Sequence, residues 1–387
     1  MPRRCGLATY TSHVFDALGA RFPEIRIDHY AMNDPGAAYD YPPSVTGTLR
    51  QDSFADYLAT AERIEASGAG LVWIQHEFGI FGGTAGAHLL ALVERLSIPV
   101  AVTLHTVLER PDADQRLVME RLIRASARLI VMAQKGREIL TRVYGVPERK
   151  LMVVPHGVPD RPYVPPALAK ARFGLAGRNV LLTFGLISPN KGLETMIEAL
   201  PAILLDDPDT VYVIAGATHP HLLAREGERY RETLQALAAQ LGVGDAVHWL
   251  DAFMDQEQLL DLVEAADLYV TPYLNLDQIT SGTLSYAVAL GRPVVSTPYQ
   301  HAAEIVGPQN GVLVEPGAAG AFAAAISRLL GDDQLRQGMA RSAYALGRSM
   351  LWRRTVEASM AGFAAINAPL LLGARPVRDL IQFAEAS

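Results

Sequence analysis

Short apolar runs alternate with longer amphipathic segments along most of the chain. In the first half, apolar runs at 72–74, 100–104, 129–132 and 151–154 are separated by stretches whose apolar residues have helical spacing. Short runs bounded by turn residues are typical of strands, and strands separated by helices form parallel sheets through βαβ units. The pattern therefore predicts an α/β fold with parallel strands.

A proline-rich stretch at 155–177 interrupts this alternation. Five prolines lie between positions 155 and 166, a density that is typical of an extended connector. After it, strand-like runs resume at 180–184, 211–215, 247–250, 268–271 and 293–296, with a long helix ending near residue 241. We therefore expect two Rossmann-like, doubly wound parallel-sheet domains. Ligands bind at the carboxyl ends of such strands, which we expect to face a central cleft.

The connector divides the chain into three expected parts. We expect an N-terminal Rossmann-like domain over residues 1–160 and a second one over residues 161–348. Residues 349–387 are expected to form helices that pack back on the N-terminal domain, the last of them over 377–386. The first of these helices carries its apolar residues at helical spacing: Trp352, Val356, Met360 and Phe363.

The start of the chain departs from the doubly wound pattern. Residues 3–10 read as a turn that leads into a helix over 12–22, and only two residues precede that turn. A doubly wound sheet normally has a strand before this turn. We therefore expect either a truncated sequence or a sheet that lacks its first strand.

Composition narrows the class of protein. The chain has 387 residues, of which 50% are hydrophobic and 19% charged, with a net charge of −7. These values exclude an intrinsically disordered chain and argue against a nucleic-acid partner. The single cysteine, Cys5, excludes an internal disulfide framework and a cysteine-based zinc site. We expect a soluble globular protein of a reducing compartment.

The most informative segment is residues 184–192, which follow a predicted strand and open a predicted helix. Gly185 permits a ligand to approach the backbone closely, and Lys191 adds a positive charge to the positive end of the helix dipole. Together these residues indicate a phosphate site. An ordinary loop with a solvated lysine is the alternative.

A second such loop, residues 277–287, also lies between a predicted strand and a predicted helix. Thr280 or Ser281 can cap that helix, and Gly282 leaves its amide unshielded. The hydroxyls of Ser281 and Thr283 can donate to oxyanions. A plain helix cap is the alternative, but two such loops in one domain can converge on one diphosphate.

Histidines follow two strands of the N-terminal domain. His76 and Glu77 come after the run at 72–74, but adjacent residues of an extended segment point to opposite sides, so we expect no metal site there. His105, at the end of the next strand, is the better polar candidate, with a core histidine bonded to a carbonyl as the alternative. Asp112 and Asp114 are interpreted as acids at a helix start.

Three common motifs are absent from the sequence. There is no Gly-x-Ser-x-Gly elbow, no Walker motif and no Gly-x-Gly-x-x-Gly fingerprint. Their absence argues against a serine hydrolase with that elbow, a P-loop NTPase and a nicotinamide dehydrogenase.

Taken together, the segments resemble the retaining glycosyltransferases of family 4, also called glycosyl transferases group 1, which have the GT-B fold. The resemblance runs from Arg4 to about Ala364. It rests on ordered matches at residues 5–9, 103–106, 154–158, 185–192, 289–295 and 304–314.

The resemblance implies roles for particular residues. Lys191 would pair with the donor diphosphate, and His105 would contact the transferred sugar. It implies no cofactor and no metal, because the lysine and helix N-termini neutralise the leaving group. The implied catalytic residues are His105 and Lys191. The implied donor-binding residues are Gly6, Gly185, Lys191, Gln278, Ser281, Gly282, Thr283 and Tyr286. The implied acceptor-side residues are His76, Glu77 and Gly79.

The sequence departs from the family pattern at three positions of the donor site. Leu186 stands where the family has a phosphate-binding arginine, and Gln278 and Tyr286 stand in place of two spaced glutamates. Gln278 can still bond to sugar hydroxyls. Tyr286 offers one hydroxyl and cannot accept a bidentate pair from a ribose.

The resemblance implies a retaining, metal-independent hexosyltransferase. The donor would be GDP- or UDP-hexose, with mannose or glucose as the sugar, and the acceptor a saccharide or a lipid-linked sugar. We expect a cytoplasmic protein with peripheral contact at the inner membrane face. Leu186 and Tyr286 keep open a retaining glycoside phosphorylase on the same fold. A non-catalytic sugar- or nucleotide-binding protein is the third hypothesis.

Overall fold

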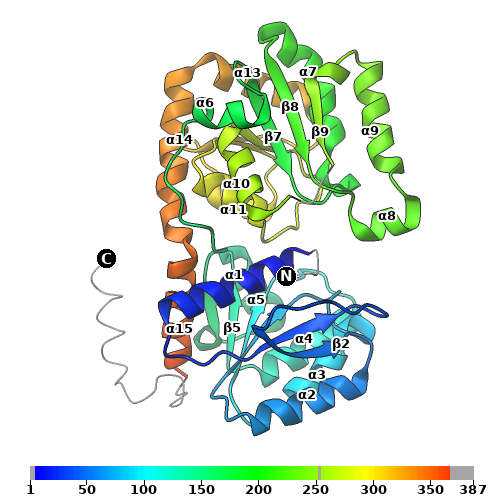
Figure 1. Cartoon of the computed structure of the whole chain (residues 1–387), viewed down its shortest axis with the longest axis vertical. Helices are drawn as coiled ribbons and strands as arrows, with labels where there is room; N and C mark the ends of the chain where they lie inside the picture. The colour runs from blue at the N-terminus through cyan, green and yellow to red at the C-terminus, as the bar shows by residue number, and fades with distance from the viewer. Residues whose placement is uncertain (1–4, 252–253, 367–387) are drawn as a thin grey trace. The chain divides into compact units, whose positions relative to one another are not determined.

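The computed structural model describes residues 5–251 and 254–366 (Figure 1). The chain forms two compact units, the first extending to Gly157 and resuming at Trp352, the second running from Val158 to Leu351. Both units combine helices with parallel sheets, which confirms the predicted α/β class. The helix expected over 377–386 lies outside the described residues.

The second unit is built on a six-stranded parallel sheet with the order β12-β11-β10-β7-β8-β9. From β7 the chain adds strands in one direction to β9, and it then places β10 on the other side of β7. This reversal is a topological switch point, where doubly wound sheets bind ligands. The strands are β7 (Asn179–Phe184), β8 (Thr210–Ala215), β9 (Val247–Leu250), β10 (Leu268–Thr271), β11 (Val294–Ser296) and β12 (Gly311–Leu313).

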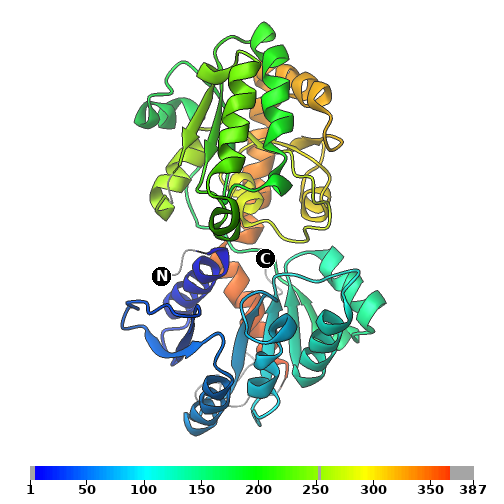
Figure 2. The same cartoon turned by 90° about the vertical axis from the view of Figure 1, so that its right-hand side faces the viewer.

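Helices cover both faces of this sheet (Figure 2). On one face lie α7 (Leu193–Asp206), α9 (Arg229–Gln240) and α13 (Ala319–Gly331); on the other lie α10 (Gln256–Ala265), α11 (Gly282–Ala289) and α14 (Asp333–Gly347). Every residue of β8 is buried. Burial on both faces explains why these strands read as continuous apolar runs. The remaining helices of this unit are α6 (Pro166–Ala169), α8 (Pro220–Glu226) and α12 (Gln300–Ile305).

The first unit contains two separate parallel sheets. A four-stranded sheet has the order β3 (Val72–His76), β4 (Val100–Leu104), β5 (Arg128–Val131) and β6 (Leu151–Val153). A two-stranded sheet pairs β1 (His29–Asn33) with β2 (Val45–Arg50). Its helices are α1 (Gly6–Arg21), α2 (Phe54–Ala66), α3 (His88–Val93), α4 (Ala113–Ala125), α5 (Gln134–Tyr144) and α15 (Trp352–Ala364).

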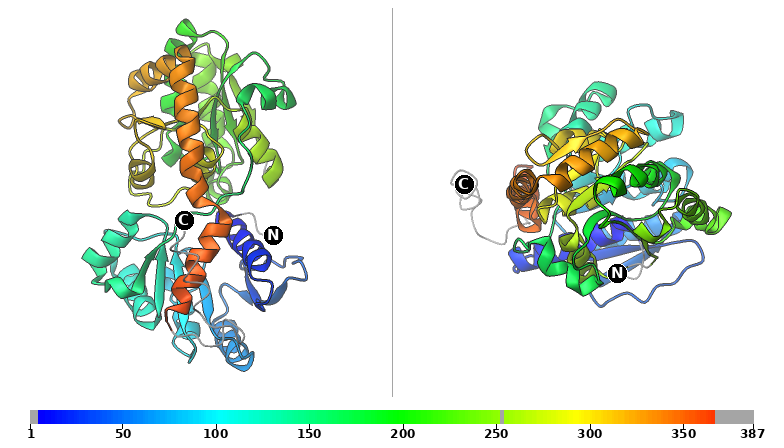
Figure 3. Two further views of the ribbon diagram at one scale, coloured as in Figure 1. Left: turned by 90° about the vertical axis from the view of Figure 1, so that its left-hand side faces the viewer. Right: turned by 90° about the horizontal axis from the view of Figure 1, so that it is seen from above.

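Helices α1 and α15 lie side by side in the first unit (Figure 3). Tyr10, Val14 and Leu18 of α1 pack with Val356 and Phe363 of α15 in one buried cluster. The cluster also contains apolar residues of β4 and β5, so the two helices cover one face of the four-stranded sheet. Helix α15 therefore belongs to the hydrophobic core of the first unit.

Several sequence expectations need correction in detail. The turn expected over residues 3–10 is wrong from residue 6, because α1 begins at Gly6 and the Cys5 Sγ accepts the Ala8 N–H at its N-terminus (3.4 Å). The connector expected over 155–177 contains α6 and a 3₁₀ turn, Lys170–Phe173. The long helix expected to end near residue 241 is two helices, α8 and α9.

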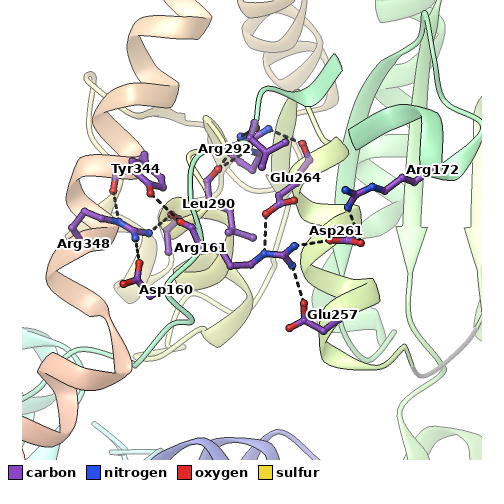
Figure 4. Close-up of polar contacts among 12 residues, drawn as sticks. Asp160, Arg161, Arg172, Glu257, Asp261, Glu264, Leu290, Arg292, Tyr344 and Arg348 are labelled. Carbon is purple, nitrogen blue, oxygen red and sulfur yellow. Dashed lines mark hydrogen bonds and ion pairs between the residues drawn. The ribbon is translucent and has the colours of Figure 1, made fainter. Parts of the chain in front are cut away.

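Two arginines, one buried and one partly exposed, hold the start of the second unit in place (Figure 4). Arg292 is fully buried, and its five N–H groups bond to the carbonyls of Val164, Glu264, Ala266 and Leu290 at 2.8–3.0 Å. Nearby, Arg161 bonds to Asp261 (2.7 Å). The residues that follow the domain junction are thus tied to α10 and to the loop before β11.

Replacing Arg292 by methionine should destabilise the second unit by about 4 kcal/mol. The change would leave several buried carbonyls without donors, and each such loss costs roughly 1–3 kcal/mol. The matched control is Arg225→Met, since the Arg225 side chain is 74% exposed and should change stability by less than about 0.5 kcal/mol. Urea unfolding followed by circular dichroism measures both. Equal stability of the two variants would contradict the prediction.

Candidate functional site

The two predicted phosphate loops meet at the switch point of the second unit. Gly185, directly after β7, has a φ of +118°, a conformation that favours glycine. Gly192 also has a positive φ, and a Cβ there would lie 2.2 Å from the carbonyl oxygen of Pro272, which follows β10. The Leu274 N–H donates to the Asn190 carbonyl (3.0 Å). The structure therefore brings together the loops after β7 and β10.

The second loop ends at the N-terminus of α11, where the Ser281 Oγ accepts the Leu284 N–H (3.3 Å). The N–H groups of Gly282 and Thr283 lie in the first turn, where a helix offers no acceptor of its own. The Ser281 N–H, in contrast, donates to the His301 Nδ1 (2.9 Å). The first-turn amides at 282 and 283 are therefore the backbone donors that this helix can offer to an anion.

Lys191, in the loop after β7, places its ammonium group beside the loop that follows β10. Its Nζ lies 3.8 Å from the centroid of the Tyr273 ring, within the range of a cation–π contact. The Tyr273 hydroxyl lies 3.5 Å from the Thr283 Oγ1, and the Thr283 Oγ1 lies 3.1 Å from the Ser281 Oγ. Tyr273 thus connects Lys191 with the N-terminus of α11.

The charge of Lys191 also acts on the tyrosine. Burial raises the pKa of Tyr273, but the nearby ammonium and hydrogen bonds outweigh burial and hold this pKa below its usual value. The ring is 1% exposed and stacks on Tyr299, with centroids 5.1 Å apart. The Lys191 ammonium therefore lies over a buried tyrosine ring that is itself stacked on a second tyrosine.

The two residues that replace the family glutamates lie in different surroundings. The Gln278 Nε2 donates to the Thr280 carbonyl (2.9 Å), so this side chain braces its own loop. Tyr286 lies on α11 and its side chain is buried in the hydrophobic core, and burial raises its pKa. Their roles in donor binding stay predictions.

In the first unit, polar residues gather where β3 and β4 end. The His105 Nε2 lies 3.0 Å from the Gln75 Oε1, and the Thr106 hydroxyl donates to the Glu77 Oε2 (2.6 Å). Burial lowers the pKa of His105 to about 3, with smaller contributions from His156 and His76. Burial also raises the pKa of Glu77. His105 is therefore neutral near pH 7, and can position a polar group but cannot act as a cation.

His76 occupies the apolar interior rather than a polar surface. Its side chain is fully buried, with its ring edge-on to Phe78 (5.1 Å) and stacked on Phe81 (5.7 Å). Neither ring nitrogen has a hydrogen-bond partner among the described residues, and burial lowers its pKa to about 4. The nearby Gly79 carbonyl accepts the Gln51 Nε2 (3.1 Å). Acceptor-side roles for His76, Glu77 and Gly79 stay predictions.

Two neighbours of His105 were not singled out from the sequence. The ring of Tyr10, on α1, lies edge-on to His105 with centroids 4.7 Å apart, and 5.1 Å from the ring of His156. Burial lowers the pKa of His156 to about 4. His156 could have been identified from the matched segment 154–158. Tyr10 could not, because only the packing of α1 on the sheet brings it to His105.

The described residues were compared with two further kinds of site, a metal centre and a membrane-spanning helix. Across residues 5–251 and 254–366, no group of three or more His, Cys, Asp or Glu side chains is placed to hold a metal ion. Among the same residues, every helix is too short or too polar to cross a bilayer.

Two family models match the chain. "Glycosyltransferase Family 4" matches residues 6–161, and "Glycosyl transferases group 1" matches residues 169–346. One curated relative, the D-inositol 3-phosphate glycosyltransferase of Segniliparus rotundus, is 29% identical over 74% of this chain and 65% of its own. The enzyme of the same name from Geodermatophilus obscurus is 32% identical over 70% of this chain and 62% of its own. The chain thus spans under two thirds of the length of these relatives.

Solved structures share the fold. A sucrose-phosphate synthase from Thermosynechococcus elongatus superposes with a TM-score of 0.75 at 20% identity, covering 94% of each chain. Anabaena HepE in complex with UDP and glucose has a TM-score of 0.74 at 17% identity, covering 94% of this chain and 97% of its own. These neighbours are GT-B proteins, which confirms the predicted fold class.

The buried histidines predict a loss of stability in acid. His76 has a folded pKa of about 4 against an ordinary value of 6.5, so the unfolded chain takes up its proton first as pH falls. As pH falls from 6.5 to 4, protonation of this one residue in the unfolded chain should lower the free energy of unfolding by about 3 kcal/mol. Above pH 6.5 it should have no effect, because the residue is neutral in both states. His76→Leu should abolish that share of the acid sensitivity.

The measurement can be confined to the first unit. Of the three tryptophans, Trp73 and Trp352 lie in that unit, so a Trp249→Phe background leaves fluorescence that reports on it alone. Urea unfolding of this background with and without His76→Leu, at pH 7 and at pH 5, gives the slope. An identical pH dependence in both proteins would refute the assignment.

Proposed function

Because the chain belongs to the glycosyltransferases of family 4 and group 1, we propose that it transfers a hexose from a nucleotide-sugar donor with retention of configuration. The proposed sugars are mannose and glucose, carried by GDP or UDP. The proposed acceptor is a saccharide or a lipid-linked sugar, reached in the cytoplasm, with peripheral contact at the membrane for a lipid-linked acceptor.

One observation carries this proposal. Gly185, Lys191 and the first turn of α11 meet at the switch point of the second unit, and each suits a phosphate in a different way. The glycine permits close approach, the lysine supplies charge, and the helix start supplies N–H donors. A diphosphate presents oxygens to all three groups. UDP, bound by the solved neighbour HepE, has this chemistry.

The proposed chemistry depends on charge stabilisation more than on proton transfer by the protein. As the bond from the sugar to the diphosphate breaks, negative charge grows on the leaving phosphate, where Lys191 and the amides of Gly282 and Thr283 stabilise it. The acceptor hydroxyl attacks the same face of the sugar and gives its proton to that phosphate. His105, being neutral, would orient the transferred sugar. The roles of Lys191 and these amides require no metal.

The acceptor can be identified by testing a panel of compounds. The curated relatives are named for D-inositol 3-phosphate, so this compound belongs in the acceptor panel with simple saccharides and a lipid-linked sugar. The Glu77 carboxylate accepts a hydrogen bond from Thr106, which follows His105, and we propose that it also accepts a hydrogen bond from an acceptor hydroxyl.

Removing the charge of Lys191 should impair the donor site selectively. We expect Lys191→Met to weaken binding of UDP or GDP at least tenfold and to lower kcat/KM for the sugar nucleotide by about 100-fold or more. Lys135→Met is the matched control, because Lys135 lies on α5 of the first unit beside Glu138 (3.4 Å). Calorimetry with the nucleotides and release of nucleoside diphosphate measure the two effects.

The same assays separate the proposal from its competitors. Binding of neither nucleotide at millimolar concentration would rule out a nucleotide-sugar donor. Formation of sugar phosphate from a disaccharide and inorganic phosphate, with no nucleotide present, would identify a phosphorylase instead. The anomeric configuration of the first product, read by proton NMR, tests retention directly.

A further inference from the structure

The proposed donor site has to hold a diphosphate with fewer side-chain cations than the family pattern provides. Leu186 stands where that pattern has a phosphate-binding arginine, so of the two cations only Lys191 is present. A lysine side chain is long and flexible, and fixing its ammonium at one place costs conformational entropy. A group that fixes Lys191 before the donor arrives therefore strengthens donor binding.

The structure gives Lys191 an aromatic partner. Its Nζ lies 3.8 Å from the centroid of the Tyr273 ring. The face of an aromatic ring carries partial negative charge and attracts an ammonium within about 6 Å of the centroid, most strongly where water is excluded. A carboxylate would also hold the ammonium, but it would neutralise the charge that a diphosphate needs. The ring holds the cation and leaves that charge available.

The Tyr273 ring is itself fixed from several sides. It is buried and stacks on the ring of Tyr299, with the two planes 20° apart. The Thr297 hydroxyl donates to the Tyr273 carbonyl (2.7 Å). The next residue along the chain, Leu274, donates its N–H to the Asn190 carbonyl in the lysine loop (3.0 Å). The backbone that carries the ring is therefore bonded to the loop that carries the lysine.

The contact with Lys191 is made over the ring of Tyr273, and the hydroxyl has a weaker contact of its own. The hydroxyl oxygen lies 3.5 Å from the Thr283 Oγ1. Strong hydrogen bonds between hydroxyls are shorter, at about 2.5–3.0 Å. Removal of the hydroxyl should therefore cost little, whereas removal of the ring should release the lysine.

We propose that Tyr273 is a positioning residue of the donor site, whose ring holds the Lys191 ammonium where the β-phosphate binds and so compensates for the arginine that Leu186 replaces. This role presupposes the nucleotide-sugar donor proposed above. Tyr273 is buried and acts on the diphosphate only through Lys191. A tyrosine that served only to fill the core would not depend on the lysine in this way.

The test compares Tyr273→Phe, which keeps the ring, with Tyr273→Leu, which removes it. Calorimetry with UDP and GDP should show that Tyr273→Leu weakens binding of the preferred diphosphate about tenfold, and Tyr273→Phe by less than about threefold. UMP and GMP lack the β-phosphate, so their affinities should change less than about twofold in either variant. If Tyr273→Leu is unfolded at the assay temperature, Tyr273→Met takes its place, because methionine fills irregular space.

A double-mutant cycle shows whether Tyr273 acts through Lys191. In a Lys191→Met background, Tyr273→Leu should change the affinity for the diphosphate by less than about twofold, because the group that it positions is gone. Equal losses in the two backgrounds, or an equal loss for the monophosphates, would show a structural role and overturn the proposal.

Two further results would also overturn it. One is wild-type affinity for the diphosphate in Tyr273→Leu; the other is a loss in Tyr273→Phe as large as that in Tyr273→Leu, which would assign the effect to the hydroxyl. Each of these failures leaves the glycosyltransferase proposal standing. A wild-type protein that binds neither UDP nor GDP would instead contradict the proposed donor, and the role of Tyr273 with it.

Discussion

The position of β10 beside β7 is the constraint on which the proposed donor site depends. Because strands are added first on one side of β7 and then on the other, the loops that follow β7 and β10 emerge next to each other. Gly185 and Leu274 are 89 positions apart in the sequence, yet the Leu274 N–H donates to the Asn190 carbonyl in the first loop. Gly192 then permits an approach to the Pro272 carbonyl that a side chain would block, and Gly185 adopts a positive φ that favours glycine. Lys191 and the start of α11 are brought together by this topology.

The polar groups singled out in the two units differ in charge. In the second unit, a lysine and helix amides concentrate positive potential, and the aromatic support of Tyr273 keeps that lysine in place. In the first unit, burial lowers the pKa values of His105 and His156, so these two histidines are neutral at physiological pH. A positively charged group can bind a diphosphate, and a neutral polar group can bind a sugar. In the proposed reaction the second unit therefore binds the diphosphate and the first unit contacts the sugar.

Much of the second unit could be predicted from sequence because its strands are buried on both faces. Continuous apolar runs located β7 to β11 within a residue or two, and glycine with lysine located the phosphate loop. The first unit was harder to predict. Strands β1 and β2 are mostly half-buried or exposed, so they lack such runs and were not anticipated. The start of α1 was misjudged because Gly6, Thr9 and Thr11 resemble turn residues, while packing on α15 makes them helical. Tyr10 reaches His105 only through that packing.

The central claim is that the loops after β7 and β10 bind one diphosphate. The most direct measurement is a crystal structure of the full chain soaked with UDP or GDP. The account predicts β-phosphate oxygens within hydrogen-bond distance of the Lys191 Nζ and of the amide nitrogens of Gly282 and Thr283. A diphosphate bound elsewhere on the protein, with these three groups in contact with solvent or with each other, would contradict it.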